Sequence, residues 1–147
     1  TTQQRIGKPD KLLFSFHGIP QSYVCEDEPY QSQCLVTASL IAKKLNLNES
    51  QYEVAFQSRF GKAEWIKPYL SSRLEELPKE GIHNIHVFCP GFSSDCLETI
   101  DEIGRESKEE FFEHGGKSFE FIPCLNSEES FINALMDIQK KADIKIL

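Results

Sequence analysis

The sequence predicts an α/β fold in which a four-stranded parallel sheet is flanked by helices. Four short apolar segments, at residues 12–16, 52–57, 84–89 and 118–124, alternate with longer segments whose apolar residues recur at helical spacing. The resulting βαβαβαβα order is typical of parallel strands joined by right-handed helical crossovers. The chain has 147 residues and no internal repeat or linker, so we expect residues 1–147 to form a single domain with a buried core.

The first two strands are separated by one helix. The apolar run at residues 12–16 stops at His17-Gly18-Ile19-Pro20, where glycine and proline predict a turn. Residues 30–45 are expected to be helical, and two asparagines then end the pattern before the second strand at residues 52–57. The helix is predicted from four apolar residues at helical spacing: Leu35, Ala38, Ala42 and Leu45.

The third strand follows a second helix. Pro68 can begin this helix, because proline lacks the N–H that the first helical position does not use. Gly81 ends it, after Pro78 has disturbed its last turn. The apolar run at residues 84–89 is then the third strand, and Pro90-Gly91 stops it.

An acidic helix leads to the last strand. Ser94 or Asp95 can cap a helix over residues 95–113, which a pair of glycines ends. Residues 118–124 form the fourth strand, and residues 129–142 form the last helix. In that last helix we expect three apolar side chains to face inward: Phe131, Leu135 and Ile138.

Composition excludes several classes of protein. The net charge of −7 and the absence of a basic run argue against nucleic-acid binding. No apolar stretch approaches the roughly 20 residues of a membrane span. Five cysteines without a C-x-x-C pair predict no disulfide framework and no thiolate zinc or iron–sulfur site, so we expect a reduced, cytoplasmic protein. Dinucleotide-binding, P-loop and serine-hydrolase motifs are also missing from the sequence.

The predicted site lies where the parallel strands end, because open α/β sheets bind ligands beyond the carboxyl ends of their strands. His17 directly follows the first strand. It is either a general base or metal ligand, or a loop histidine bonded to a backbone carbonyl. Arg59, after the second strand, would pair with a ligand carboxylate or with an acidic side chain of the chain itself.

The acidic helix carries the second candidate. At about 100° per residue, one side of an α-helix would hold Leu97, Ile100, Gly104 and Phe111. Another arc of roughly 80° would hold Asp95, Glu98, Glu102 and Glu106. Such a row is either a solvated face or a path for a cation or protons. Cys96 invites a nucleophile hypothesis, but the adjacent acids oppose a thiolate.

Aromatic residues border the same strand ends, namely Phe16, Phe60, Trp65 and Phe92. They are either core residues or a wall for a flat apolar ligand. Four motifs then become specific in combination: LLFSFHGIPQSY (12–23), FQSRFGKAEW (56–65), HVFCPGFSSDCLETIDEI (86–103) and FEFIPCLN (119–126). They resemble ferrochelatase, in particular its bacterial forms, from residue 11 to about residue 137.

The resemblance implies a fold and a reaction. The fold is the Rossmann-like, chelatase-type three-layer sandwich, and this chain resembles the C-terminal half of a two-domain enzyme whose N-terminal domain is missing. The family inserts Fe²⁺ into protoporphyrin IX to give protohaem, the last step of haem synthesis. The resemblance implies no organic cofactor and, with these cysteines, no iron–sulfur cluster. Fe²⁺ and protoporphyrin IX would be the substrates, and the full enzyme would contact the membrane surface peripherally.

The resemblance also implies roles for individual residues. His17 and Glu98 would be catalytic and would ligate Fe²⁺, with His17 accepting pyrrole protons or binding the metal. Two further groups on the acidic helix, Asp95 and Glu102, would guide protons or metal. The family's animal members carry histidine where this chain has Cys96. The aromatic lining of the porphyrin pocket would include Trp65 and Phe92.

Two other functions remain open at this point. One is a small chelatase that inserts cobalt into a different tetrapyrrole and works as a dimer of single domains. The motifs over residues 57–65 and 89–99 favour ferrochelatase over it. The other is a non-catalytic module that binds a tetrapyrrole or a metal, which a titration with protoporphyrin and Fe²⁺ would reveal by binding without metallation. The chain lacks an initiator methionine, so we expect it to be one domain of a longer polypeptide.

Overall fold

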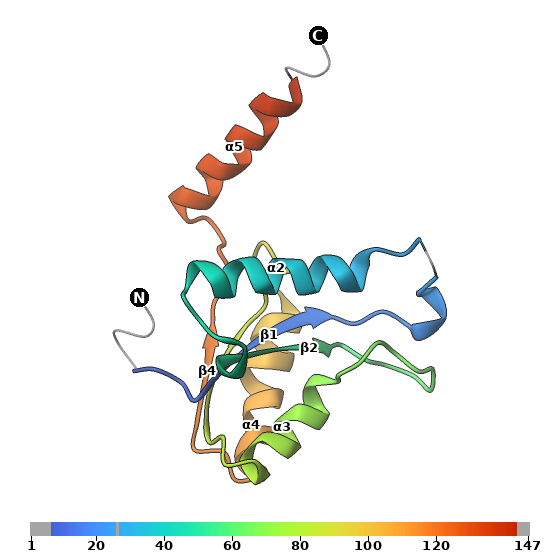
Figure 1. Ribbon diagram of the computed structural model, residues 1–147, viewed down its shortest axis with the longest axis vertical. Coiled ribbons are helices and arrows are strands. Elements are labelled where there is room, and N and C mark those ends of the chain that lie inside the picture. Colours follow the sequence, from blue (N-terminus) through green and yellow to red (C-terminus); the bar gives the residue numbers. More distant parts are fainter. Residues whose placement is uncertain (1–6, 26, 144–147) are drawn as a thin grey trace.

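The computed structural model describes residues 7–25 and 27–143, and its centre is a four-stranded parallel sheet (Figure 1). The strands are β1 (Lys11–His17), β2 (Tyr52–Gln57), β3 (Asn84–Phe88) and β4 (Ser118–Ile122). All neighbouring strands are parallel, and they lie in the order β2-β1-β3-β4. The chain therefore adds β2 on one side of β1 and then adds β3 and β4 on the other side. This confirms the predicted sheet, and each strand ends within two residues of its predicted limit.

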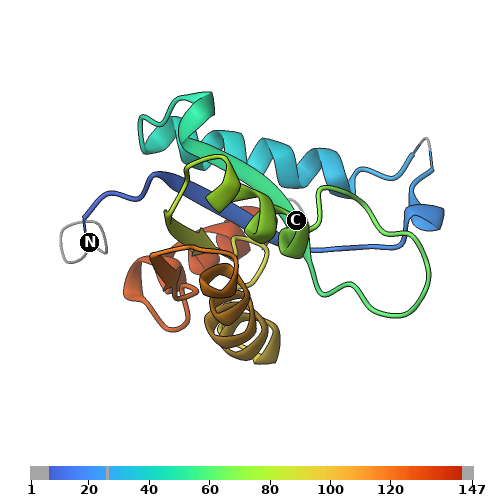
Figure 2. The same cartoon turned by 90° about the horizontal axis from the view of Figure 1, so that it is seen from below.

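Helices cover both faces of the sheet (Figures 1 and 2). They are α2 (Tyr30–Lys44), α3 (Leu70–Lys79), the π-helical segment η3 (Glu98–Ser107), α4 (Lys108–Glu113) and α5 (Glu129–Asp143). The described residues also form two short 3₁₀ turns, η1 (Gln21–Tyr23) and η2 (Glu49–Gln51). Among the described residues, no helix is both long enough and apolar enough to cross a membrane.

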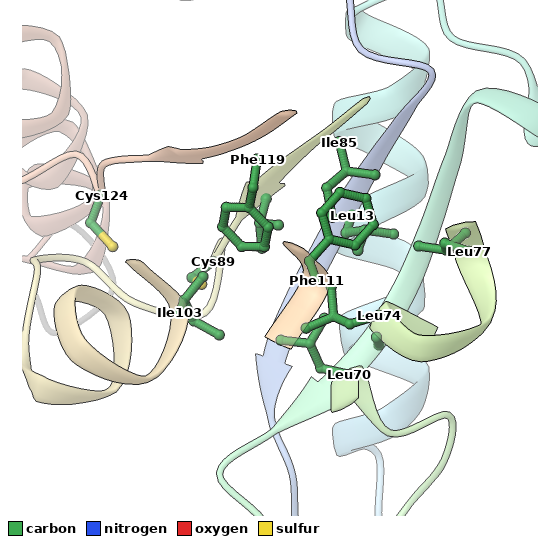
Figure 3. Packing of buried hydrophobic residues seen from close by; sticks show 12 residues of the cluster. Leu13, Leu70, Leu74, Leu77, Ile85, Cys89, Ile103, Phe111, Phe119 and Cys124 are labelled. Carbon is green, nitrogen blue, oxygen red and sulfur yellow. The ribbon is translucent and has the colours of Figure 1, made fainter. Parts of the chain in front are cut away.

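The core has one layer on each side of the sheet. On one side, α3, η3 and α4 pack on the strands, and Figure 3 shows Phe111 of α4 beside Leu13 and Leu74. On the other side α2 packs on β1 and β2 through small residues, with Ala38 and Ala42 buried. The sheet is therefore buried on both faces, as a parallel sheet requires.

The first predicted helix is confirmed to within one residue, and the second begins later than predicted. Of the four apolar residues that predicted α2, Ala38 and Ala42 are buried together with Cys34, while Leu35 and Leu45 are exposed. The spacing was helical, but small side chains at every fourth position let the helix approach the sheet closely. The helix predicted to begin at Pro68 begins two residues later, at Leu70, while the Pro68 carbonyl accepts a hydrogen bond from Phe56 N–H (2.8 Å).

The acidic helix differs most from its prediction. It begins at Glu98 rather than Asp95, and its first ten residues are π-helical, with i→i+5 bonds and a wider turn. The wider turn buries every fourth residue: Thr99, Ile103, Ser107 and Phe111. Leu97 and Ile100, predicted to share one side of the helix with Phe111, are 73% and 60% exposed, whereas Phe111 is buried.

The last helix exists where it was predicted, but its apolar side faces away from the core. α5 extends away from the sheet in Figure 1. Leu135 and Ile138 are exposed, and Phe131 is half-buried. Periodicity identifies an apolar stripe on a helix and leaves open which surface covers it.

Candidate active site

His17 is the last residue of β1, where it stands half-buried at the carboxyl edge of the sheet. Its Nδ1 lies 2.6 Å from the carbonyl oxygen of Gly18. A carbonyl can only accept, so Nδ1 carries the proton and a neutral ring keeps the lone pair of Nε2 free. The Tyr30 hydroxyl donates to the His17 carbonyl (2.7 Å) and fixes the backbone below the ring. The loop-histidine hypothesis and the functional hypothesis are thus compatible.

Two long loops, one after β1 and one after β2, extend from the same end of the sheet (Figure 2). The loop after β1 pairs with the loop after β2 through the bonds Gln21 N–H to Glu64 O (2.8 Å) and Ile66 N–H to Ile19 O (3.0 Å). Gly18 is required at their contact. A Cβ there would lie 3.0 Å from Gln57 O and 3.1 Å from the Trp65 ring.

Trp65 lies inside this pair of loops. Its side chain is only 4% exposed, with its ring centroid 6.3 Å from that of His17. The exposed Phe60 ring covers it edge-on at 4.9 Å. The buried Trp65 Nε1–H has no hydrogen-bond acceptor among the described residues. A tryptophan rarely leaves this donor unpaired when it is buried.

Glu98 begins η3 and is half-buried at the same rim. A hydrogen bond from the Cys96 side chain holds the pKa of this carboxyl below its usual value, and its own backbone N–H and the charge of His17 add to the effect. Glu98 is therefore ionised at neutral pH. Within the described part of the chain, the His17 and Glu98 side chains form no direct hydrogen bond, and their pairing stays a prediction.

Asp95 is separated from that pair. Its carboxylate accepts hydrogen bonds from Cys124 N–H (3.0 Å) and the Asn126 side chain (2.8 Å), which tie the loop after β3 to the loop after β4. Burial alone would raise its pKa, but these bonds hold the pKa below the usual value. The structure thus removes Asp95 from the row of carboxylates to which it was assigned.

Glu102 is tied to the end of β2. Its carboxylate accepts from Ser58 N–H (2.6 Å), from Ser58 Oγ–H (2.7 Å) and from the Gln57 carboxamide (3.4 Å). Ser58 has a left-handed backbone (φ 64°), which these bonds help to hold. Glu98, Glu102 and Glu106 follow each other at the four-residue spacing of η3. They line a hollow of about 340 Å³, together with Arg59 and Phe60.

Comparisons with known proteins identify the family of this chain. The ferrochelatase family model matches residues 1–143. The chain belongs to the ferrochelatase family. Over 132 residues it is 51% identical to the ferrochelatases of Janthinobacterium sp. (strain Marseille) and Herminiimonas arsenicoxydans, and over 136 residues it is 49% identical to that of Hydrogenovibrio crunogenus. These matches cover 90–92% of this chain and 36% of each relative, so the chain spans little more than a third of their length.

A solved structure with a similar fold is a putative cobalamin biosynthesis CbiX protein from Marinobacter aquaeolei VT8. It is 13% identical, with a TM-score of 0.61, and the likeness covers 93% of this chain and 99% of that one. This supports the Rossmann-like, chelatase-type fold class.

The other predicted aromatics of this ferrochelatase-family chain lie in different surroundings. Phe16 is buried in the core under α2, while Phe92 is half-buried against the opposite core layer. Arg59 stacks on the Tyr69 ring at 4.5 Å rather than reaching a carboxylate. Cys96 is half-buried, and its N–H donates to Thr99 Oγ (2.9 Å).

The donor set for a metal is small. Among residues 7–25 and 27–143, no three His, Cys, Asp or Glu side chains gather closely enough to hold a metal ion. His17 and Glu98 therefore supply two donors at most, and a cation bound there would need further ligands from its substrate, from water or from another part of the protein.

Sequence reasoning assigned no role to one residue at the strand ends, the buried Gln57. It is the last residue of β2 and is only 3% exposed. A signal was present in the strand alternation, which puts Gln57 on the same face as the buried Ala55. A polar side chain at such a position must find hydrogen-bond partners inside the protein.

Proposed function

We propose that this chain is the C-terminal domain of a two-domain bacterial ferrochelatase and that it forms one wall of the cleft where Fe²⁺ enters protoporphyrin IX. The observation that carries the proposal is the free Nε2 of His17 at the same rim as the ionised Glu98. Membership of the ferrochelatase family and the partial coverage of its members support it. The protein would act in the cytoplasm, and contact of the full enzyme with the membrane surface is part of the proposal.

The reaction replaces two pyrrole protons by one Fe²⁺ ion, which must also lose its water shell. A base and a carboxylate beside an apolar macrocycle meet these needs. His17 Nε2 would accept a pyrrole proton from the porphyrin or would coordinate the Fe²⁺ ion. Glu98 would replace water on Fe²⁺ and offset its charge. A site with only two protein donors holds a metal weakly, which suits an ion that must be passed on.

Trp65 and Phe92 are proposed to line the porphyrin pocket, with Glu102 and Asp95 guiding protons or metal. The hydrogen bonds of Glu102 and Asp95 to their own loops mean that any such role competes with these structural contacts. No organic cofactor and no iron–sulfur cluster are part of the proposal. Fe²⁺ and protoporphyrin IX are the substrates.

The test is the variant His17→Ala in the full-length protein. Metallation of protoporphyrin by Fe²⁺ should fall at least about 100-fold, the usual contribution of a positioned base. The matched control is His83→Ala. His83 lies at the opposite end of β3 and contacts the Gly115 carbonyl (3.0 Å), so its loss should leave the rate nearly unchanged. Haem formation by the His17 variant at the wild-type rate would contradict the assignment.

The 147-residue chain alone should not metallate porphyrin, because the second wall of the cleft would lie outside it. Turnover by this chain alone would contradict the two-domain proposal.

The likeness to the CbiX protein favours a second candidate, a cobalt chelatase that acts as a dimer of single domains. Co²⁺ insertion into a tetrapyrrole by the isolated chain would support that candidate. A third outcome, tight binding of protoporphyrin by the full-length protein without metallation, would point to a non-catalytic binding module.

A further inference from the structure

The Gln57 carboxamide joins four parts of the structure at the base of the site. Its Oε1 accepts from Ser15 Oγ–H of β1 (2.6 Å) and from the Cys89 thiol after β3 (3.4 Å). Its Nε2 donates to the Glu98 carbonyl (3.0 Å) and to the Glu102 carboxylate (3.4 Å) of η3. Both lone pairs and both N–H groups of this buried amide are therefore used.

The chemistry of the partners fixes which way the amide points. A backbone carbonyl and a carboxylate can only accept, so the NH₂ group must face Glu98 and Glu102. The Ser15 hydroxyl and the Cys89 thiol can donate, so the oxygen faces the sheet. One end of Gln57 thus belongs to the sheet and the other end to η3.

The end that faces η3 acts on the residue that carries the reactive carboxylate. Nε2 binds the backbone carbonyl of Glu98 itself, in the first turn of the π-helical segment. Leu97 and Ile100, on either side of Glu98, are largely exposed and cannot anchor this turn by packing. The first turn of η3 is held to the sheet by Thr99 and by this hydrogen bond, and Glu102 adds a second anchor one turn later.

We propose that Gln57 is a positioning residue for metal insertion, which fixes the first turn of η3 and thereby holds the Glu98 carboxylate opposite His17. It touches neither substrate nor metal and acts through Glu98. The proposal rests on the function proposed above. It adds that His17 and Glu98 are not sufficient by themselves. A hydrogen-bond donor on β2, the Gln57 amide, must also hold Glu98 at the right distance from His17.

The test compares two variants of the full-length protein. Gln57→Leu keeps the size of the side chain and removes all four bonds. Ser15→Ala removes only a partner of the oxygen end and serves as the control for loss of stability. We expect Gln57→Leu to lower kcat for Fe²⁺ insertion at least 10-fold, with KM for protoporphyrin within twofold of wild type. We expect Ser15→Ala to keep kcat within twofold even where it lowers the melting temperature.

A third variant, Gln57→Glu, keeps the shape and the oxygen end. The ionised form cannot donate to the Glu98 carbonyl, but a protonated carboxyl can donate through its O–H. Burial beside Glu102 raises the pKa of the new carboxyl toward neutrality. The ratio of the kcat of this variant to that of wild type should therefore rise at least fivefold from pH 8 to pH 6.

Hydrogen–deuterium exchange of the η3 amides gives a readout that does not depend on activity. Exchange at residues 98–103 should rise at least 10-fold in Gln57→Leu and stay near wild type in Ser15→Ala. The proposal is overturned if Gln57→Leu keeps wild-type kcat, if Ser15→Ala loses as much activity as Gln57→Leu, or if the ratio for Gln57→Glu is independent of pH. A wild-type protein that inserts no Fe²⁺ would refute the proposed function instead, and the exchange data would then decide the role of Gln57 in holding η3.

Discussion

The bond between Glu102 and the end of β2 should be one of the strongest single contributions to stability on this side of the sheet. Glu102→Ala removes two short charge-assisted bonds from Ser58 and leaves the left-handed Ser58 backbone without support. Hydrogen bonds to a charged group are worth about 1.5–3 kcal/mol each. Because Glu102 is half-exposed, we take the low end of that range and expect the free energy of unfolding to fall by about 2–3 kcal/mol.

Urea denaturation at pH 7, followed by circular dichroism, measures this loss as a lower midpoint at an unchanged slope. Glu102→Gln keeps the shape and one acceptor oxygen, so it should lose only about 1 kcal/mol. Glu109→Ala is the control. Glu109 is exposed and forms only a 3.5 Å surface ion pair with Arg105, so its removal should cost less than about 0.5 kcal/mol. The reasoning is refuted if Glu102→Ala is as stable as the control.

Two further predictions concern a buried histidine of the sheet and a glycine in the loop after β1. Burial lowers the pKa of His86, against a smaller opposing effect of Glu120, so the unfolded chain takes up a proton near the ordinary pKa of 6.5 and the folded chain does so only at a lower pH. The free energy of unfolding should therefore fall as the pH drops below 6.5, by at most about 1.4 kcal/mol per pH unit. Urea titrations at pH 7, 6 and 5 should show a smaller dependence on pH for His86→Leu than for wild type. An identical dependence on pH in the two proteins would contradict the assignment. Gly18→Ala places a methyl group against Gln57 O and Trp65 and should lower the free energy of unfolding by about 1–3 kcal/mol. Gly61→Ala is the control, because a methyl group there has no atom within 4 Å and the variant loses stability only through the left-handed φ of 71°. Equal losses in the two glycine variants, together with unchanged tryptophan fluorescence in Gly18→Ala, would contradict the close contact.

The strands and their order along the chain could be predicted almost completely. Each strand is a short apolar run stopped by residues with strong local preferences, such as Gly18 and Pro20 or Pro90 and Gly91, and these preferences act within a few residues. The same locality placed His17 at the end of β1. Because parallel strands share one carboxyl edge, the start of the acidic helix could be placed at the same edge as His17, whereas the pairing of His17 with Glu98 came from the family resemblance and stays a prediction.

The helix faces could not be predicted as well. The residues over 95–107 were read with the period of an α-helix, and the wider π-helical turn changed which side chains are buried. Leu97 and Ile100 moved outward for this reason, and Thr99 and Ile103 took their place. α5 failed differently, since its apolar stripe is real but the described part of the chain does not cover Leu135 or Ile138.

The sequence by itself determined the alternation of strands and helices, the edge of the sheet that carries the site, and the family to which the chain belongs. These follow from patterns local in the chain. Only the tertiary structure decided how each carboxylate is used. Asp95 binds the loop after β4, 29 residues away, and Glu102 binds Ser58, 44 residues away, while Gln57 links β2 to both β1 and η3. Hydrogen bonds between residues this distant form only when the sheet and η3 have packed together, so no local pattern records them.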